Sequence, residues 1–302
     1  MSTRITNNMI SRSVLTDLND IAVKQAATRR QMSSGKAINR PSDDPYLAGR
    51  AMSLRSELDR IKQHEVNVQE AQGWMTVTDT ALGQIGDMAN LARGLVVQGG
   101  TDTLPQASRD ALADQIDQLI AGMKQEANAT YDGRYVLGGN KTANRPYDSS
   151  LTGNDDYSGD YAAQPRDIGP GVSINVNVVG ADVLGDSASG NKRLLGVLRD
   201  VSAHLRTGDT AALGGTDLKA LDAQIDNLLA VRASVGAGMN RLTTAENRLA
   251  ELEESALSML SEAEDADMAK TLTDFSTQQA VYQSALNAGA RIVQASLLDF
   301  LR

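Results

Sequence analysis

The chain has 302 residues, room for about two or three domains, and 41% of them are hydrophobic but only 3% aromatic. The net charge of −9 argues against a nucleic-acid binder, because binding a phosphate backbone requires clustered Lys and Arg, and the lack of cysteine excludes disulfides and thiol chemistry. No apolar run approaches the roughly 18 residues that span a bilayer, so we expect no membrane insertion. The composition favours helices packed on helices over one thick globular core.

The first predicted element is an amphipathic helix from about Thr3 to Met32, which Gly35 ends. Its apolar positions alternate in steps of three and four, the spacing of a coiled-coil seam. The seam consists of Val14, Leu18, Ile21, Gln25, Thr28 and Met32. Residues 1–40 carry seven basic side chains and two acidic ones, whereas residues 251–302 carry nine acidic side chains and three basic ones. The two ends of the chain therefore attract each other at long range, unless these charges are ordinary solvated helix faces.

Residues 34–45 are predicted to be an ordered linker. Pro41 and Pro45 cannot continue a helix interior, and Asp43 and Asp44 are suited to capping the next helix. The linker residues that we single out are Gly35, Asn39, Arg40, Pro41, Asp43, Asp44 and Pro45.

Residues 46–130 are predicted to form the outgoing helices of a rod. From Leu47 the seam resumes and continues to Val97 without a proline, which predicts a helix of about 50 residues, or roughly 75 Å. Three polar residues, Glu65, Gln72 and Asp79, fall on this seam. They could fix the register or the partner, but we favour a rotation of the helix face, because a 3.6-residue helix drifts against a 3.5-residue repeat.

Residues 131–190 differ from the rest by their glycine, tyrosine and proline content. Short alternating runs at 134–137 and 172–179 predict strands joined by turns. We therefore expect a small β-rich inserted domain, followed by returning rod helices at 191–262. The predicted fold class is mainly α, a long antiparallel helical bundle or coiled-coil rod with this insertion.

The last predicted element is a second amphipathic segment at 263–302. Its seam steps through Leu272, Phe275, Gln279, Tyr282, Leu286, Gly289, Val293, Ser296 and Phe300. Leu297 and Leu301 extend the apolar face. The acidic residues between Glu251 and Asp267, Glu264 among them, are interpreted as a solvated helix face rather than paired catalytic carboxylates. Amphipathic helices with matching apolar stripes at both ends predict that the chain pairs its own ends or polymerises.

No motif in the chain indicates catalysis or a cofactor. A phosphate-binding loop has Ser or Thr after its Gly-Lys pair, but Gly35 and Lys36 are followed by Ala37, so this motif is incomplete. His64 and His204 each stand alone, without a second histidine at metal-ligand spacing. A stretch that imitates a calcium loop has Pro165 at its twelfth position, where a bidentate carboxylate is needed. We expect no enzyme, no cofactor and no metal site.

The linker sequence SSGKAINRPSDDP resembles the signature that follows the first helix in the flagellin family. The stretch from Ile85 to Leu119, and Asp265-Ala266-Asp267 with the seam behind it, are similar to the family's other helical segments. The resemblance covers roughly residues 1–140 and 216–302. Within the family, Pro41 and Pro45 resemble the hook-filament junction proteins rather than the filament flagellins.

The resemblance implies that residues 1–33 and 263–302 form an inner coiled-coil domain that orders on assembly. It implies an assembly interface made of the terminal seam residues Val14, Leu18, Ile21, Met32, Leu272, Phe275, Tyr282, Leu286, Val293, Leu297, Phe300 and Leu301. The implied partners are further copies in a ring or helical array, the first hook-associated junction protein, flagellin, and an export chaperone on the C-terminal helix. The implied location is the extracellular flagellum, reached unfolded through the flagellar type III apparatus.

Three other functions are alternatives to that of a junction subunit. A short filament flagellin has the same architecture, and a secreted adhesin would use the insertion to bind a receptor. An enzyme hidden in residues 131–190 would need convergent polar side chains, and this stretch contains no His, Cys or Glu.

Overall fold

The computed structural model describes residues 7–148 and 154–300, and it confirms the predicted fold class of long helices with a small β-rich insertion. The chain forms two compact units, residues 1–60 with 252–302, and residues 61–251. Two long helices, α2 (Pro45–Gly99) and α7 (Leu218–Glu264), contribute to both units.

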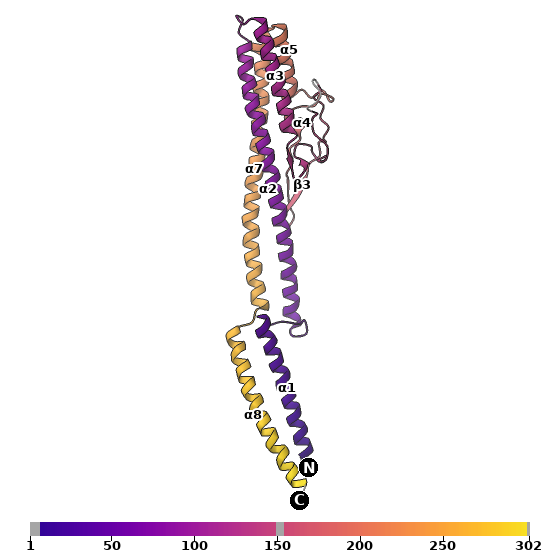
Figure 1. The fold of residues 1–302 in the computed structure, drawn as a ribbon, viewed down its shortest axis with the longest axis vertical. Coiled ribbons are helices and arrows are strands. Elements are labelled where there is room, and N and C mark those ends of the chain that lie inside the picture. Colours follow the sequence, from indigo (N-terminus) through magenta and orange to yellow (C-terminus); the bar gives the residue numbers. More distant parts are fainter. Residues whose placement is uncertain (1–6, 149–153, 301–302) are drawn as a thin grey trace. The chain divides into compact units, whose positions relative to one another are not determined.

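In the unit formed by the chain ends, α1 (Asn7–Ser34) and α8 (Met268–Phe300) lie side by side and antiparallel (Figure 1). Gly35 ends α1 in the left-handed region, at φ 71°, a conformation that glycine adopts without steric cost. Its neighbour Lys36 forms an antiparallel bridge with Asp265, just before α8. The linker and the turn between α7 and α8 are therefore joined by backbone bonds.

Asp44 caps the N-terminus of α2. Its Oδ1 accepts hydrogen bonds from the backbone N–H groups of Tyr46 and Leu47, each at 3.0 Å. Pro45, the first residue of α2, has no N–H to satisfy and a backbone φ already suited to a helix. The sequence Asp-Pro therefore sets where α2 begins.

The unit of residues 61–251 contains a helical bundle. Its elements besides α2 and α7 are α3 (Gln106–Ala127), α5 (Leu194–Thr207), the short α6 (Thr210–Ala212) and the π-helical turn η1 (Leu213–Asp217). Helix α3 packs on α5, and it has buried apolar side chains spaced three or four residues apart. They include Leu112, Ile116, Ile120 and Met123.

The polar seam residues of α2 pair with α7. Gln72 donates from Nε2 to Glu246 Oε2 at 2.8 Å, and Arg232 donates from Nε to Asp79 Oδ1 at 3.1 Å. The hydrogen bond to Asp79 raises the pKa of the Arg232 guanidinium. For Gln72 and Asp79 the expected rotation of the helix face is therefore wrong, because both remain on the side of α2 that meets α7.

Within its described residues, the β-rich insertion contains two hairpins and a short helix, α4 (Gly180–Val183). Strands β1 (Thr130–Tyr131) and β2 (Arg134–Tyr135) pair antiparallel across Asp132-Gly133. Both turn residues have positive φ, 51° and 71°, as a two-residue hairpin turn requires. The Asp-Gly sequence thus determines this turn.

The second hairpin pairs β3 (Pro165–Gly169) with β4 (Val172–Asn175). The strands expected at 134–137 and 172–179 are shorter than predicted. Beyond Tyr135 the backbone bonds to other segments, since Val136 N–H donates to Ala129 O and Leu137 O accepts from Gly180 N–H. Val136 and Leu137 are fully buried by this arrangement.

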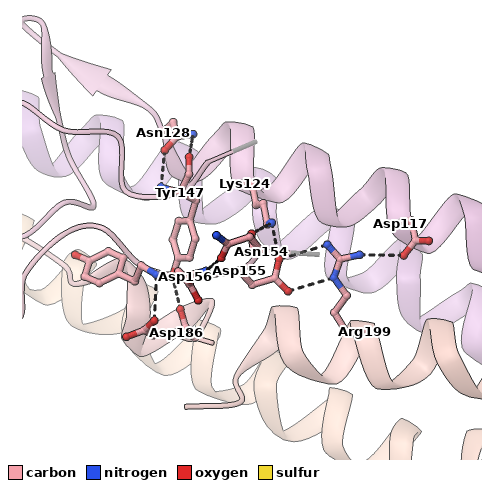
Figure 2. A network of polar contacts seen from close by, with 11 residues as sticks. Asp117, Lys124, Asn128, Tyr147, Asn154, Asp155, Asp156, Asp186 and Arg199 are labelled. Atoms are coloured by element: carbon pink, nitrogen blue, oxygen red, sulfur yellow. Dashed lines mark hydrogen bonds and ion pairs between the residues drawn. The ribbon is translucent and has the colours of Figure 1, made fainter. Parts of the chain in front are cut away.

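A buried ion pair fastens the insertion to the bundle (Figure 2). Lys124 on α3 is 2% exposed, and its Nζ lies 2.5 Å from Asp155 Oδ1. Arg199 on α5 donates from Nε to the other oxygen of Asp155 at 3.2 Å and contacts Asp117. Burial would raise the pKa of the Asp155 carboxyl, but hydrogen bonds from Arg199 and Lys124 outweigh burial and lower this pKa. Asp155 therefore remains ionised and bridges two helices.

A tyrosine cluster completes the attachment. Tyr147 is fully buried and donates its hydroxyl to Gly185 O at 2.5 Å, while Asn128, the residue that follows α3, donates to Tyr147 O at 2.8 Å (Figure 2). Burial raises the pKa of the Tyr147 hydroxyl. Asp186 accepts from Tyr157 N–H at 3.1 Å, so the loop that follows α4 is held to the same cluster.

Candidate assembly interface

The apolar face of α1 lies toward α8. Val14, Leu18, Ile21 and Met32 are all half-buried, and Thr28 on the same face is buried. These positions repeat every three or four residues, so one stripe of α1 meets α8 along the helix.

Only part of the predicted seam of α8 faces α1. Phe275 and Tyr282 are half-buried, but Leu272 and Leu286 remain 55% and 44% exposed. The other buried or half-buried positions within 268–290 are Thr271, Gln278, Ala285 and Gly289. Sequence analysis missed Thr271, Gln278 and Ala285, because their polar or small side chains do not stand out in an apolar repeat.

Gly289 permits close approach of the two terminal helices. A Cβ atom at this position would lie 3.0 Å from Val14 Cγ1, tighter than ordinary van der Waals contact. A side chain at position 289 would therefore require Val14 to shift.

The pair of terminal helices has almost no buried core of its own. Among the side chains described at 12–34 and 268–290, only Thr28, Thr271 and Gly289 are buried, and none is a large apolar residue. Several large apolar residues are instead exposed. They are Met9, Leu15 and Val23 on α1, and Met268, Leu272, Val281 and Leu286 on α8. Two helices with this little burial are marginally stable alone, so further apolar surface is needed to hold them.

The remaining predicted interface residues lie near the end of the chain. Val293, Leu297 and Phe300 belong to the part of α8 for which the backbone alone is described, and Leu301 lies outside the described residues.

The linker is held in place by backbone bonds. Ala37 N–H donates to Glu264 O at 2.7 Å, and Ala266 N–H donates to Gly35 O at 2.9 Å. Asp43 Oδ2 accepts from the N–H groups of Asn39 and Arg40, at 3.1 and 2.9 Å. This turn leaves Asn39, Arg40 and Pro41 exposed.

Glu264 corrects one sequence prediction. We expected it on a solvated acidic face, but it is 3% exposed at the end of α7. Its Oε1 accepts hydrogen bonds from Lys36 in the linker and from Arg55 Nη2 on α2, the latter at 2.5 Å. Two cations make burial of this carboxylate possible. Glu264 thus ties together the linker and the adjoining ends of α2 and α7.

Within 7–148 and 154–300, no three His, Cys, Asp or Glu side chains converge as a metal site. In the same part of the chain, none of the helices has the length and hydropathy of a membrane span.

Two protein-family models match the chain, one toward each end. The family model of the bacterial flagellin N-terminal helical region matches residues 5–142, and that of the C-terminal helical region matches residues 218–301. The chain belongs to the flagellin family. The two matches leave out residues 143–217, which contain most of the β-rich insertion.

Flagellin-family relatives match the chain from end to end. Flagellar hook-associated protein 3 of Salmonella typhimurium is 23% identical, covering 99% of this chain and 100% of that protein. A flagellin of Bacillus subtilis is 27% identical over the same shares. The solved structure of flagellar hook-associated protein 3 from Legionella pneumophila, 15% identical, matches with a TM-score of 0.63 and covers 70% of this chain and 98% of its own. At 15% identity, the likeness to the Legionella pneumophila structure shows a shared fold.

Proposed function

We propose that this chain is a structural subunit of the bacterial flagellum that joins the hook, through the first hook-associated protein, to the flagellin filament. The observation that carries the proposal is the linker with Pro41 and Pro45, which resembles the junction proteins and is held by Glu264. The end-to-end likeness to a hook-associated protein 3 supports it. The chain acts by assembly and has no catalytic role.

The terminal helices are the assembly elements in this proposal. Their exposed apolar residues, such as Leu15, Leu272 and Leu286, become covered only when neighbouring subunits pack against them. Residues 1–33 and 263–302 form the inner domain, the helices at 46–130 and 191–262 form the rod, and the insertion lies outside. The chain travels unfolded through the type III apparatus, and a chaperone binds the C-terminal helix until assembly.

Hydrogen exchange on the soluble monomer tests whether the termini order on assembly. We expect fast exchange in peptides from 12–34 and 268–290, because this helix pair buries no large apolar side chain. Peptides from 61–130 and 216–250 should exchange slowly, since they contain the buried bundle. Equal protection of both groups would mean that the termini are already stable in one chain, and assembly by terminal ordering would be wrong.

The alternative function is a short filament flagellin, and the likeness to the Bacillus subtilis flagellin favours it. The position of the chain along the flagellum separates the two functions. A label on the exposed insertion should give one short segment at the base of each filament. Label along the whole filament would favour the flagellin. Binding of the isolated insertion to host cells would instead support the adhesin.

A further inference from the structure

A pocket of about 230 Å³ lies between the linker and the start of α2. Lys36, Arg40, Pro41, Met52, Arg55 and Glu264 are among the residues that line it. All of them belong to the unit formed by the chain ends. Met52 is 63% exposed, so an apolar surface is available at the mouth of the pocket.

Hydrogen bonding around the pocket is incomplete. Glu264 Oε1 accepts from both Lys36 and Arg55, whereas Glu264 Oε2 is buried and has no hydrogen-bond partner among the described residues. A buried carboxylate oxygen without a donor is costly. Because this oxygen is closed to the surface, a docking partner is recognised by the exposed groups around the pocket instead.

The mouth of the pocket is basic. Lys36 and Arg55 have side chains 43% and 51% exposed, and Arg40 is exposed. With Glu264 the lining carries three cations and one anion, and a guanidinium has five N–H donors, more than Glu264 uses. A carboxylate on the partner is attracted to this mouth.

The complementary groups lie on the outer face of α7 in the same unit. Ser258, Met259 and Glu262 are exposed there, with Met259 at 37%. At 3.6 residues per turn, Glu262 points roughly 160° away from Glu264, while Ser258 lies one turn before Glu262 on the same face. This face offers a hydroxyl donor, an apolar side chain and a carboxylate within about one turn.

We propose that the outer face of α7 in one copy docks into the linker pocket of the next copy. Glu262 accepts from Arg40 and Arg55, and Met259 packs on Met52. Because pocket and docking face are different surfaces of one chain, the contact is heterologous and propagates into a ring or helical array. This inference rests on the proposed function, and it identifies the surface of the neighbouring copy that fills the pocket.

Crosslinking in isolated flagella tests the contact, and the absence of native cysteine gives a clean background. Chains with Arg40→Cys and chains with Glu262→Cys are produced in one strain, and the flagella are treated with a short bismaleimide. Mixed flagella should yield dimers, and a chain carrying both substitutions should yield a ladder of higher oligomers. Glu57→Cys, exposed on the opposite side of α2 from Met52 and Arg55, is the control partner for Glu262→Cys and should give no dimer.

Charge exchange tests the same contact without crosslinking. Arg40→Glu or Glu262→Arg alone should lower the amount of chain in isolated flagella about tenfold, and the double variant should restore it. Absence of dimers, or no rescue by the double variant, would overturn the docking. If the label nevertheless remains at the filament base, the junction function stands and only the docking fails. Label along the filament would reject the junction function whatever the crosslinks show.

Discussion

Replacing Asp155 by alanine is expected to lower the free energy of unfolding of the 61–251 unit by about 3–5 kcal/mol, the cost of breaking a buried ion pair. The substitution leaves Lys124, which is 2% exposed, without its 2.5 Å carboxylate partner. It also removes the bridge from Arg199 on α5. Urea unfolding followed by the fluorescence of Trp74, the chain's only tryptophan, measures the loss in this unit.

The matched control is Asp200→Ala. Asp200 pairs with Lys192 at 2.9 Å, but both side chains are exposed, at 46% and 69%. Its loss should change the free energy of unfolding by about 0–1 kcal/mol. If Asp155→Ala behaves like this control, water or a shifted side chain compensates Lys124, and the network does not fasten the insertion.

Replacing Leu286 by aspartate is expected to abolish incorporation into flagella while changing the monomer's free energy of unfolding by no more than about 0.5 kcal/mol. Leu286 is 44% exposed in the single chain, so the monomer loses little buried surface. In the assembled array the same position would place a carboxylate against apolar neighbours, which is strongly unfavourable. Flagellar incorporation and urea unfolding of the purified chain are measured side by side.

Ser284→Asp is the control for charge alone. Ser284 is also exposed on α8 but lies well away from the stripe that contains Leu272 and Leu286. It should incorporate normally. If Leu286→Asp assembles as well as Ser284→Asp, the exposed stripe is not an assembly surface. If Leu286→Asp unfolds the monomer, the separation between assembly face and folded core is wrong.

The helices could be predicted from sequence because their signals are local. The spacing of Val14, Leu18 and Ile21 indicates the half-buried stripe of α1, and Gly35 marks the end of this helix. The glycine- and tyrosine-rich texture of residues 131–190 likewise indicates the insertion. In each case neighbouring residues carry the information, so no tertiary knowledge is needed.

The side-chain networks could not be predicted in this way. Lys124 and Asp155 are separated by a long stretch of irregular sequence, and no spacing rule connects them. Glu264 was assigned to a solvated face for the same reason, because its partners Lys36 and Arg55 are distant in the chain. Their pairing follows from how the segments meet, which a local pattern does not encode.

The paired polar residues between α2 and α7 also determine how the two helices align along their length. A slip of one heptad would move Asp79 away from Arg232 and place it beside Met239 or Ile225. Leucine-type contacts repeat every heptad and tolerate such a slip, whereas a carboxylate facing methionine does not. The two polar pairs therefore favour one alignment of the chain's longest helices over those that are shifted by one heptad.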